Sequence, residues 1–208
     1  MLLRLTLIRH ALTDWNASGR FQGAADVALN SEGRDQARRL AAYVARLEPE
    51  AVVYSSPLKR AVETAAIAFP GRELRLDARL KGIDFGEFEG KTQAENELHP
   101  GWATWFGDPY QLPAPGGESY AMLRARAVAW MEEVVAAGPD HVVAVTHSGT
   151  IQMLLAHVLG VEKVRWRKRI YLRHASVSRV LFRGDEVLVE RVNDTRHLAL
   201  EGGDPFLD

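Results

Sequence analysis

The sequence predicts an α/β fold with three layers, in which helices cover both faces of a mostly parallel central sheet. Short apolar runs alternate with longer segments of helical periodicity along most of the 208 residues, and this alternation is typical of parallel sheets. The runs Leu3–Ile8 and Val142–Thr146 are almost continuously apolar, as expected of strands that are buried on both faces. We therefore expect both runs to lie in the centre of the sheet.

Capping residues indicate where the helices begin. Asn30 or Ser31 can cap a helix that Pro49 ends, and Ser56 can cap another that has Pro57 at its first position. The expected elements, in order, are strand Leu3–Ile8, a loop over 13–26, a helix over about 31–48, strand Ala51–Tyr54, a helix from Pro57, strand Glu73–Leu76, a helix from Ser119 to about Ala136, strand Val142–Thr146, a helix that ends at Gly160, and a hairpin of Val177–Phe182 and Val187–Val192. The tail from Glu201 to Asp208 is expected to be loose.

Residues 79–117 lack clear periodicity and are rich in Gly and Pro. We expect a single domain over residues 1–208, in which this segment is a long excursion over the active edge of the sheet. Its aromatic residues either line the wall that selects the substrate or pin the excursion to the core. These residues are Trp102, Trp105, Phe106 and Tyr110.

Composition excludes several classes of function. The formal net charge is −1, which argues against a general nucleic-acid binder and against a polybasic membrane anchor. No run of about 18 apolar residues occurs, so no membrane span is expected. The absence of cysteine fits a reducing compartment, and we expect the cytoplasm. The oligomeric state cannot be derived from the sequence.

Cationic side chains follow three of the expected strands. Arg9 and His10 end the first strand, Arg60 lies one turn into the helix after the second, and His147 ends the strand Val142–Thr146. The carboxyl ends of parallel strands lie at one edge of a sheet, where ligands bind. Two arginines and two histidines would therefore surround one small volume.

This combination is typical of a phosphoryl-transfer site. Arginine forks position a phosphoryl group and compensate its charge, and a neutral histidine can attack phosphorus to form a phosphohistidine. The backbone N–H groups of Ser148 and Gly149, at a helix start, would add donors. Two histidines could also bind a metal, but the adjacent arginines oppose a cation and no carboxylate stands at ligand spacing. We expect no metal and no other cofactor.

Several blocks of the sequence resemble the histidine phosphatase superfamily, in its phosphoglycerate mutase-like branch. They occur in family order and span residues 3 to about 180. The blocks are Leu7-Ile8-Arg9-His10-Ala11 with Thr13, Trp15 and Asn16; Phe21-Gln22-Gly23 with Asp26 and Leu29; Ser55-Ser56-Pro57-Leu58-Lys59-Arg60-Ala61 with Thr64-Ala65; Asp84-Phe85-Gly86-Glu87-Phe88-Glu89-Gly90; Pro115-Gly116-Gly117-Glu118-Ser119; and Val145-Thr146-His147-Ser148-Gly149. Ala11 stands where the family usually has glycine.

The resemblance implies roles for individual residues. His10 would be the nucleophile, and the phosphate pocket would consist of Arg9, Arg60 and His147. Family members work without a metal. Further substrate contacts would come from Thr13, Asn16, Gln22, Gly23 and Ser148.

Two positions depart from the family pattern. Gly82 stands where the resemblance places a glutamate that protonates the leaving oxygen, and a positioned acid is worth typically 10²–10⁴-fold in rate. Asp84 is one candidate substitute, since it would share a face with position 82 in an extended segment, and Glu87 is a weaker one. Both are equally well explained as ordinary loop or capping residues. His174 is near a position where the family often has asparagine, and its role is open.

Three functions remain after these departures. The leading hypothesis is a metal-independent phosphomonoesterase that forms a phosphohistidine and acts on a small phosphorylated metabolite. The second is a phosphoglycerate mutase-type transfer of the phosphoryl group to another hydroxyl. The third is a binding protein for a phosphorylated ligand with low turnover, which only Gly82 supports.

Overall fold

The protein is built around one mixed six-stranded sheet. A computed structural model describes residues 2–48, 50–161 and 170–198. The strand order is β3-β2-β4-β1-β5-β6, with β1 to β4 parallel and β5 and β6 antiparallel to their neighbours. The strands are β1 (Leu2–Arg9), β2 (Val52–Ser55), β3 (Leu74–Leu76), β4 (His141–Thr146), β5 (Val177–Arg183) and β6 (Glu186–Asp194). The predicted strands are all present, with bounds that differ by one or two residues.

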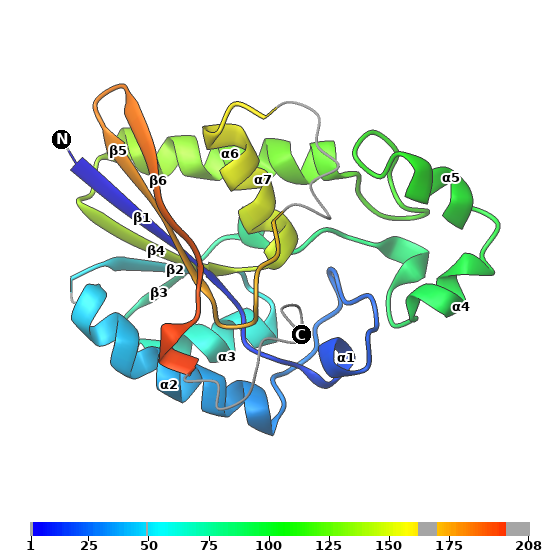
Figure 1. Cartoon of the computed structure of the whole chain (residues 1–208), viewed down its shortest axis with the longest axis horizontal. Coiled ribbons are helices and arrows are strands. Elements are labelled where there is room, and N and C mark those ends of the chain that lie inside the picture. Colours follow the sequence, from blue (N-terminus) through cyan, green and yellow to red (C-terminus); the bar gives the residue numbers. More distant parts are fainter. Residues whose placement is uncertain (1, 49, 162–169, 199–208) are drawn as a thin grey trace.

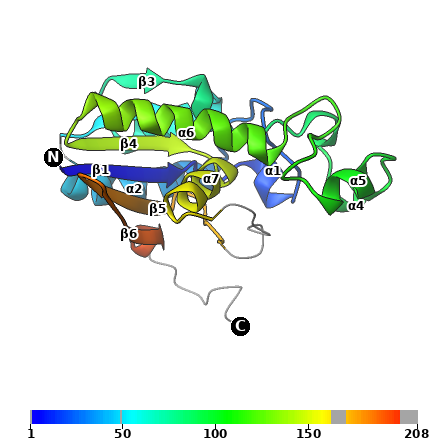
Figure 2. The ribbon, with the colours of Figure 1, turned by 90° about the horizontal axis from the view of Figure 1, so that it is seen from above.

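Helices cover both faces of this sheet, which confirms the predicted fold class (Figure 1). Alternate residues of β1 face opposite sides: Leu5 and Leu7 contact the cluster that includes α6 and α7, whereas Ile8 contacts the cluster that includes α2 and α3. Figure 2 shows β1 and β4 side by side in the middle of the molecule. The longer helices are α2 (Ser31–Leu47), α3 (Lys59–Ala68), α6 (Tyr120–Ala137) and α7 (Ser148–Val158).

Two of the three predicted helix starts are confirmed. The Asn30 side chain accepts a hydrogen bond from the Gly33 N–H at the start of α2, and Ser119 accepts one from the Met122 N–H at the start of α6. The prediction for Ser56 and Pro57 is wrong, because α3 begins at Lys59 and its cap residue Leu58 has no side-chain hydrogen bond. Pro49 and the tail 201–208 lie outside the described residues.

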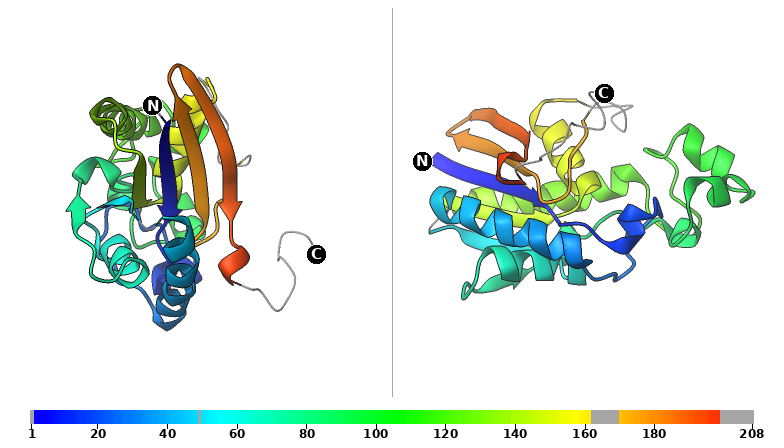
Figure 3. Two further views of the ribbon diagram at one scale, coloured as in Figure 1. Left: turned by 90° about the vertical axis from the view of Figure 1, so that its left-hand side faces the viewer. Right: turned by 60° about the horizontal axis from the view of Figure 1, so that its bottom comes forward.

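The excursion predicted over residues 79–117 contains short helices and projects beyond the ends of the strands (Figure 3). Its elements are 3₁₀ turns at Ala78–Leu80 and Gly86–Phe88 and the helices α4 (Gln93–Glu97) and α5 (Trp102–Gly107). Trp102 and Trp105 are buried in a separate apolar cluster with Phe88, Tyr120 and Met153. The tryptophans therefore anchor the excursion to the rest of the protein.

No helix in the part of the chain that the structure describes is both long and apolar enough to cross a membrane.

The central position of β1 makes its side chains a test of the fold. Leu5 is 0% exposed, whereas Leu98 in the excursion is 87% exposed. We expect Leu5→Ala to lower the free energy of unfolding by about 2–5 kcal/mol, because it removes buried surface and leaves a cavity. Leu98→Ala is the matched control and should change it by less than about 0.5 kcal/mol. Urea unfolding measures both values, and equal effects would contradict the assignment of the core.

Candidate active site

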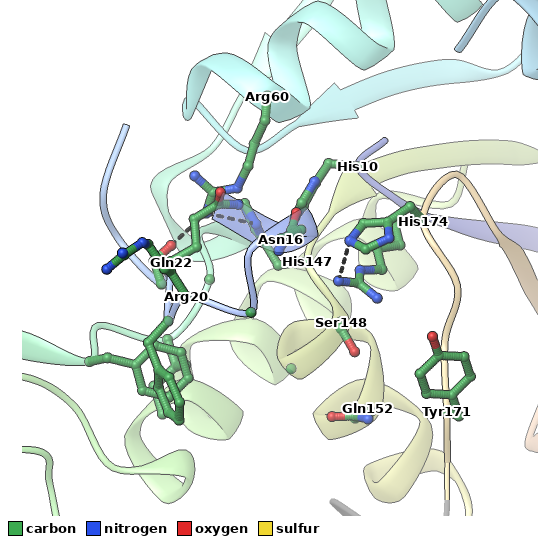
Figure 4. Close-up of a pocket in the computed structure, with 18 of the residues that line it drawn as sticks. His10, Asn16, Arg20, Gln22, Arg60, His147, Ser148, Gln152, Tyr171 and His174 are labelled. Carbon is green, nitrogen blue, oxygen red and sulfur yellow. Dashed lines mark hydrogen bonds between the residues drawn. The ribbon is translucent and has the colours of Figure 1, made fainter. Parts of the chain in front are cut away.

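The ends of β1, β2 and β4 bring the predicted cationic residues together. The strand ends are aligned, because Arg9 is the register partner of Thr146 and Ser55 that of Val145. The His10 N–H continues this pairing by donating to the Thr146 carbonyl at 2.8 Å. As a result the rings of His10 and His147 lie with their centroids 5.0 Å apart (Figure 4). The predicted convergence of three strand ends at one edge is confirmed.

A backbone carbonyl fixes the ring of His10 and its tautomer. Its Nδ1 lies 2.7 Å from the Ala11 carbonyl oxygen, and since a carbonyl only accepts, Nδ1 carries the proton and Nε2 keeps its lone pair. Burial lowers the pKa of His10 well below its usual value, and the charges of neighbouring groups, His147 and Arg60 first among them, lower it further. The ring is therefore neutral at pH 7, the form that attacks phosphorus.

Arg60 lies in the first turn of α3 and is 1% exposed. Its Nη1 donates to the Ala25 carbonyl at 2.6 Å and its Nη2 to the Gly23 carbonyl at 2.5 Å. Nη2 also lies 3.2 Å from Nδ1 of His147. Burial lowers the pKa of Arg60 to about 10, so the guanidinium stays charged at neutral pH.

Arg9 is held in the same way on the opposite side of His10. Its Nη1 donates to the Leu172 carbonyl at 2.5 Å and its Nη2 to Nε2 of His174 at 2.6 Å. Because Arg9 can only donate, Nε2 of His174 accepts and the proton of that ring lies on Nδ1. Burial, followed by the charge of Arg9, lowers the pKa of His174 well below its usual value. The sequence left the role of His174 open, and the structure shows that it positions Arg9.

Three residues of the cavity have a buried donor that finds no hydrogen-bond partner in the part of the chain that the structure describes: Arg9 at Nε, Arg60 at Nε and Gln22 at Nε2. All three residues line one cavity of about 470 Å³, together with His10 and His147. A buried polar group without a partner costs about 1–3 kcal/mol, and more when it is charged. A tetrahedral oxyanion offers three or four acceptors to such donors. The donor set therefore fits a phosphoryl group.

His147 is the first residue after β4 and caps α7. Its Nδ1 accepts from Arg60, and its Nε2 donates to Oγ of Ser56 at 2.9 Å. Burial lowers the pKa of His147 well below its usual value, and the charges of Arg60 and Arg126 add to this effect. Ser56, predicted as a helix cap, instead fixes the ring of His147.

The predicted substrate contacts fall into two groups. Asn16, Gln22, Gly23 and Ser148 line the cavity. Thr13 does not line it, because the side chain is buried and its Oγ1 donates to Oε1 of Gln22 at 2.5 Å and lies 3.0 Å from Oδ1 of Asn16. Thr13 therefore orients two residues that face the cavity.

Gly82 lines the cavity and Asp84 does not. Oδ1 of Asp84 accepts from the Gly86 N–H at 2.8 Å, so its carboxylate turns into the following loop. Glu87 is exposed and lies 3.0 Å from Nε2 of His99. The structure thus brings neither candidate acid to the cavity wall, and it gives both the loop contacts that were the alternative explanation.

Arg126 and Glu118 are functional neighbours that the sequence did not reveal. Arg126, on α6, donates to the carbonyls of residues 79, 81 and 82 at 2.7–2.9 Å. Both oxygens of Glu118 accept from Arg126, and Oε2 also accepts from the Asp84 N–H. The pair fixes the segment that carries Gly82. The only sign of this pair in the sequence was that Glu118 lies in one of the blocks that resemble the family.

Comparison with known proteins agrees with this geometry. The family model described as histidine phosphatase superfamily (branch 1) matches residues 5–195. The chain belongs to this superfamily. Among the described residues, no group of three or more His, Cys, Asp or Glu side chains could hold a metal ion.

Several relatives of this histidine phosphatase have phosphatase names. Phosphoserine phosphatase 1 of Hydrogenobacter thermophilus is 34% identical over 166 residues, 77% of this chain and 78% of the relative. Glucosyl-3-phosphoglycerate phosphatase of Mycobacterium tuberculosis is 34% identical over 176 residues, 78% of each chain. The crystal structure of phosphoserine phosphatase from Entamoeba histolytica in complex with 3-phosphoglyceric acid has a TM-score of 0.84 at 27% identity, and covers 94% of this chain and 99% of that one. The family match and these phosphatase-named relatives identify the protein as a phosphatase of this superfamily.

The lowered pKa values predict a pH dependence of stability. His10, His147 and His174 all have pKa values below the unfolded value of about 6.5. Below pH 6.5 the unfolded chain therefore binds more protons than the folded protein, and stability falls as the pH decreases. Each group contributes up to about 1.4 kcal/mol per pH unit.

We expect the free energy of unfolding, measured with urea between pH 7 and pH 5, to fall less steeply for His174→Asn than for the unaltered protein. Asparagine still offers an oxygen to Arg9, so the variant keeps an acceptor for that guanidinium. Identical slopes in the two proteins would show that His174 titrates normally in the folded state.

Proposed function

We propose that this histidine phosphatase is a phosphomonoesterase that forms a phosphohistidine at His10. One observation carries the proposal: a buried neutral imidazole lines the same cavity as Arg9, Arg60 and Gln22, each of which has a buried donor without a partner among the described residues. These donors would bind the equatorial oxygens of a phosphoryl group, whose charge the two guanidinium groups would compensate. The substrate is a small phosphorylated metabolite, and the cytoplasm, where such compounds occur, is the expected location.

The reaction has two steps. In the first, Nε2 of His10 attacks phosphorus, the bond from phosphorus to the ester oxygen breaks, and that oxygen leaves with the electron pair. The hydrogen bond from Nδ1 to the Ala11 carbonyl stabilises the positive charge that the ring acquires. In the second step, water attacks the phosphohistidine, inorganic phosphate leaves, and His10 returns to its neutral form. Arginine supplies the charge compensation, so the proposal needs no metal.

Neighbouring residues would support these steps. Ser148 and the backbone at the start of α7 lie beside His147 on the cavity wall, where N–H groups attract an anion. Asn16 lies on the same cavity, and its side chain is within reach of Thr13. We propose that Asn16, Gln22, Gly23 and Ser148 contact the phosphoryl group or the adjoining part of the substrate.

Replacement of the nucleophile tests the proposal. His10→Ala should lower the turnover of p-nitrophenyl phosphate by at least about 10⁴-fold, because it removes the group that forms the intermediate. Acid-labile, base-stable ³²P label should be trapped on the unaltered protein and not on the variant. Arg46→Ala, at an exposed position in the last turn of α2, is the control for the preparation of variants and should keep full turnover.

Product analysis with a phosphoglycerate separates the remaining alternatives. Release of inorganic phosphate is expected, whereas formation of an isomer would indicate a mutase. Unchanged turnover in His10→Ala would remove His10 from the mechanism. Tight binding of phosphate without any turnover would indicate a binding protein.

A further inference from the structure

The wall of the cavity beside His147 consists of backbone that side chains hold in place. Four successive carbonyls, those of residues 79–82, accept hydrogen bonds from side chains of α6, β4 and α7. The donors are Arg126 for residues 79, 81 and 82, Oγ1 of Thr146 for residue 80, and Oγ1 of Thr150 also for residue 81. This segment therefore has little freedom to shift.

Gly82 lies in this wall at a point where a side chain does not fit. A Cβ atom there would lie 2.9 Å from the Gly23 carbonyl oxygen and 3.3 Å from Cγ of His147. That same carbonyl accepts from Nη2 of Arg60. Any side chain at residue 82 would thus press on groups that position the phosphate site.

No carboxylate lines the cavity among the residues that the structure describes. The acidic side chains nearest in sequence are engaged elsewhere: Asp84 with the Gly86 N–H, Glu87 with His99, and Glu89 with the N–H groups of Ala24, Ala25 and Phe85. Both oxygens of Glu89 are engaged in this way and one oxygen each of Asp84 and Glu87, and none of the three residues lines the cavity.

The histidines of the cavity are poor proton donors as well. The N–H group at Nε2 of His147 donates a hydrogen bond to Oγ of Ser56. His174 is neutral because burial and the charge of Arg9 lower its pKa. A neutral imidazole gives up its remaining proton far less readily than a carboxylic acid. Tyr171 also has a hydroxyl group and lines the cavity. Figure 4 shows it well away from Arg60 and Gln22, at the other side of the cavity.

We propose that this phosphatase acts on phosphates whose leaving group departs as a stable anion, that is, on acyl phosphates, phosphoanhydrides or the phosphates of acidic phenols such as nitrophenol. The proposal rests on the phosphohistidine mechanism above. As the bond from Nε2 of His10 to phosphorus forms, the bond from phosphorus to oxygen breaks, and the electron pair stays on a carboxylate, phosphate or phenolate oxygen. Such an oxygen takes no proton from the protein, so the first step needs no acid at residue 82.

Alkyl phosphates are the contrasting class. Their leaving group is an alkoxide, which must be protonated as the bond breaks, and the loss of a positioned acid costs typically 10²–10⁴-fold in rate. The relatives named above include a phosphoserine phosphatase and a glucosyl-3-phosphoglycerate phosphatase, whose names indicate alkyl esters. This chain is thus expected to differ from them in substrate class while it keeps the phosphate site.

A series of substituted phenyl phosphates tests the proposal, because its members share one shape and differ in the acidity of the phenol. We expect kcat/KM to fall by at least about 100-fold from p-nitrophenyl phosphate to phenyl phosphate, the size of effect that a missing acid produces. Acetyl phosphate should be turned over rapidly, and phosphoserine and glycerol 2-phosphate more slowly than phenyl phosphate. A difference below about tenfold across the phenyl series, or rapid turnover of phosphoserine, would overturn the proposal.

Two variants test whether Asp84 or Tyr171 donates a proton to the leaving group. In Asp84→Asn and in Tyr171→Phe the ratio of kcat/KM for p-nitrophenyl and phenyl phosphate should stay as in the unaltered protein. A selective loss of phenyl phosphate turnover in either variant would identify that residue as the acid and would refute the proposal. Failure of the phosphohistidine mechanism gives a different result, namely no label on His10, together with either unchanged turnover in His10→Ala or no turnover of any compound.

Discussion

The buried guanidinium of Arg60 is the group on which the site depends. Its two terminal nitrogens donate to the carbonyls of Gly23 and Ala25, while the carboxylate of Glu89 accepts from the N–H groups of Ala24 and Ala25. The loop of residues 23–25 is therefore held at its carbonyl groups by the cation of Arg60 and at its N–H groups by the carboxylate of Glu89. Glu89 and Asp26 also stabilise the charge of Arg60, which offsets part of the cost of burying it. Nε of Arg60 has no hydrogen-bond partner among the residues that the structure describes.

The same arrangement explains why the histidines of the site are neutral. Burial is the largest cause of the lowered pKa of His10, His147 and His174, and the charges of Arg9 or Arg60 act in the same direction. A cluster of fixed cations thus helps to keep His10, the proposed nucleophile, neutral, and the same cations would attract an anionic substrate. Both effects follow from placing arginine and histidine at neighbouring strand ends.

Sequence reasoning located the centre of the site because each residue there follows a strand. Arg9, His10 and His147 directly end β1 and β4, and parallel pairing aligns those ends. The supporting contacts could not be derived in this way. Arg126 lies 44 residues from Gly82 in sequence and Ser56 lies 91 residues from His147, so these contacts depend on how helices and loops pack. The start of α3 was misjudged for the same reason: Oγ of Ser56 accepts from the Leu58 N–H just before the helix and also from the distant ring of His147, while the helix itself begins only at Lys59.

The excursion shows how folding and substrate selection share residues. Of its aromatic side chains, Phe85 lines the cavity, whereas Trp102 and Trp105 are buried behind it. Phe85 contacts Trp105 with ring centroids 5.9 Å apart and Phe21 with centroids 5.0 Å apart, both edge to face. Edge-to-face packing of this kind fixes the position of a ring. The tryptophans thus support Phe85 and Phe21, two of the apolar side chains of the cavity wall, so that changes in the buried cluster would alter the shape of the cavity without contacting Arg9 or Arg60.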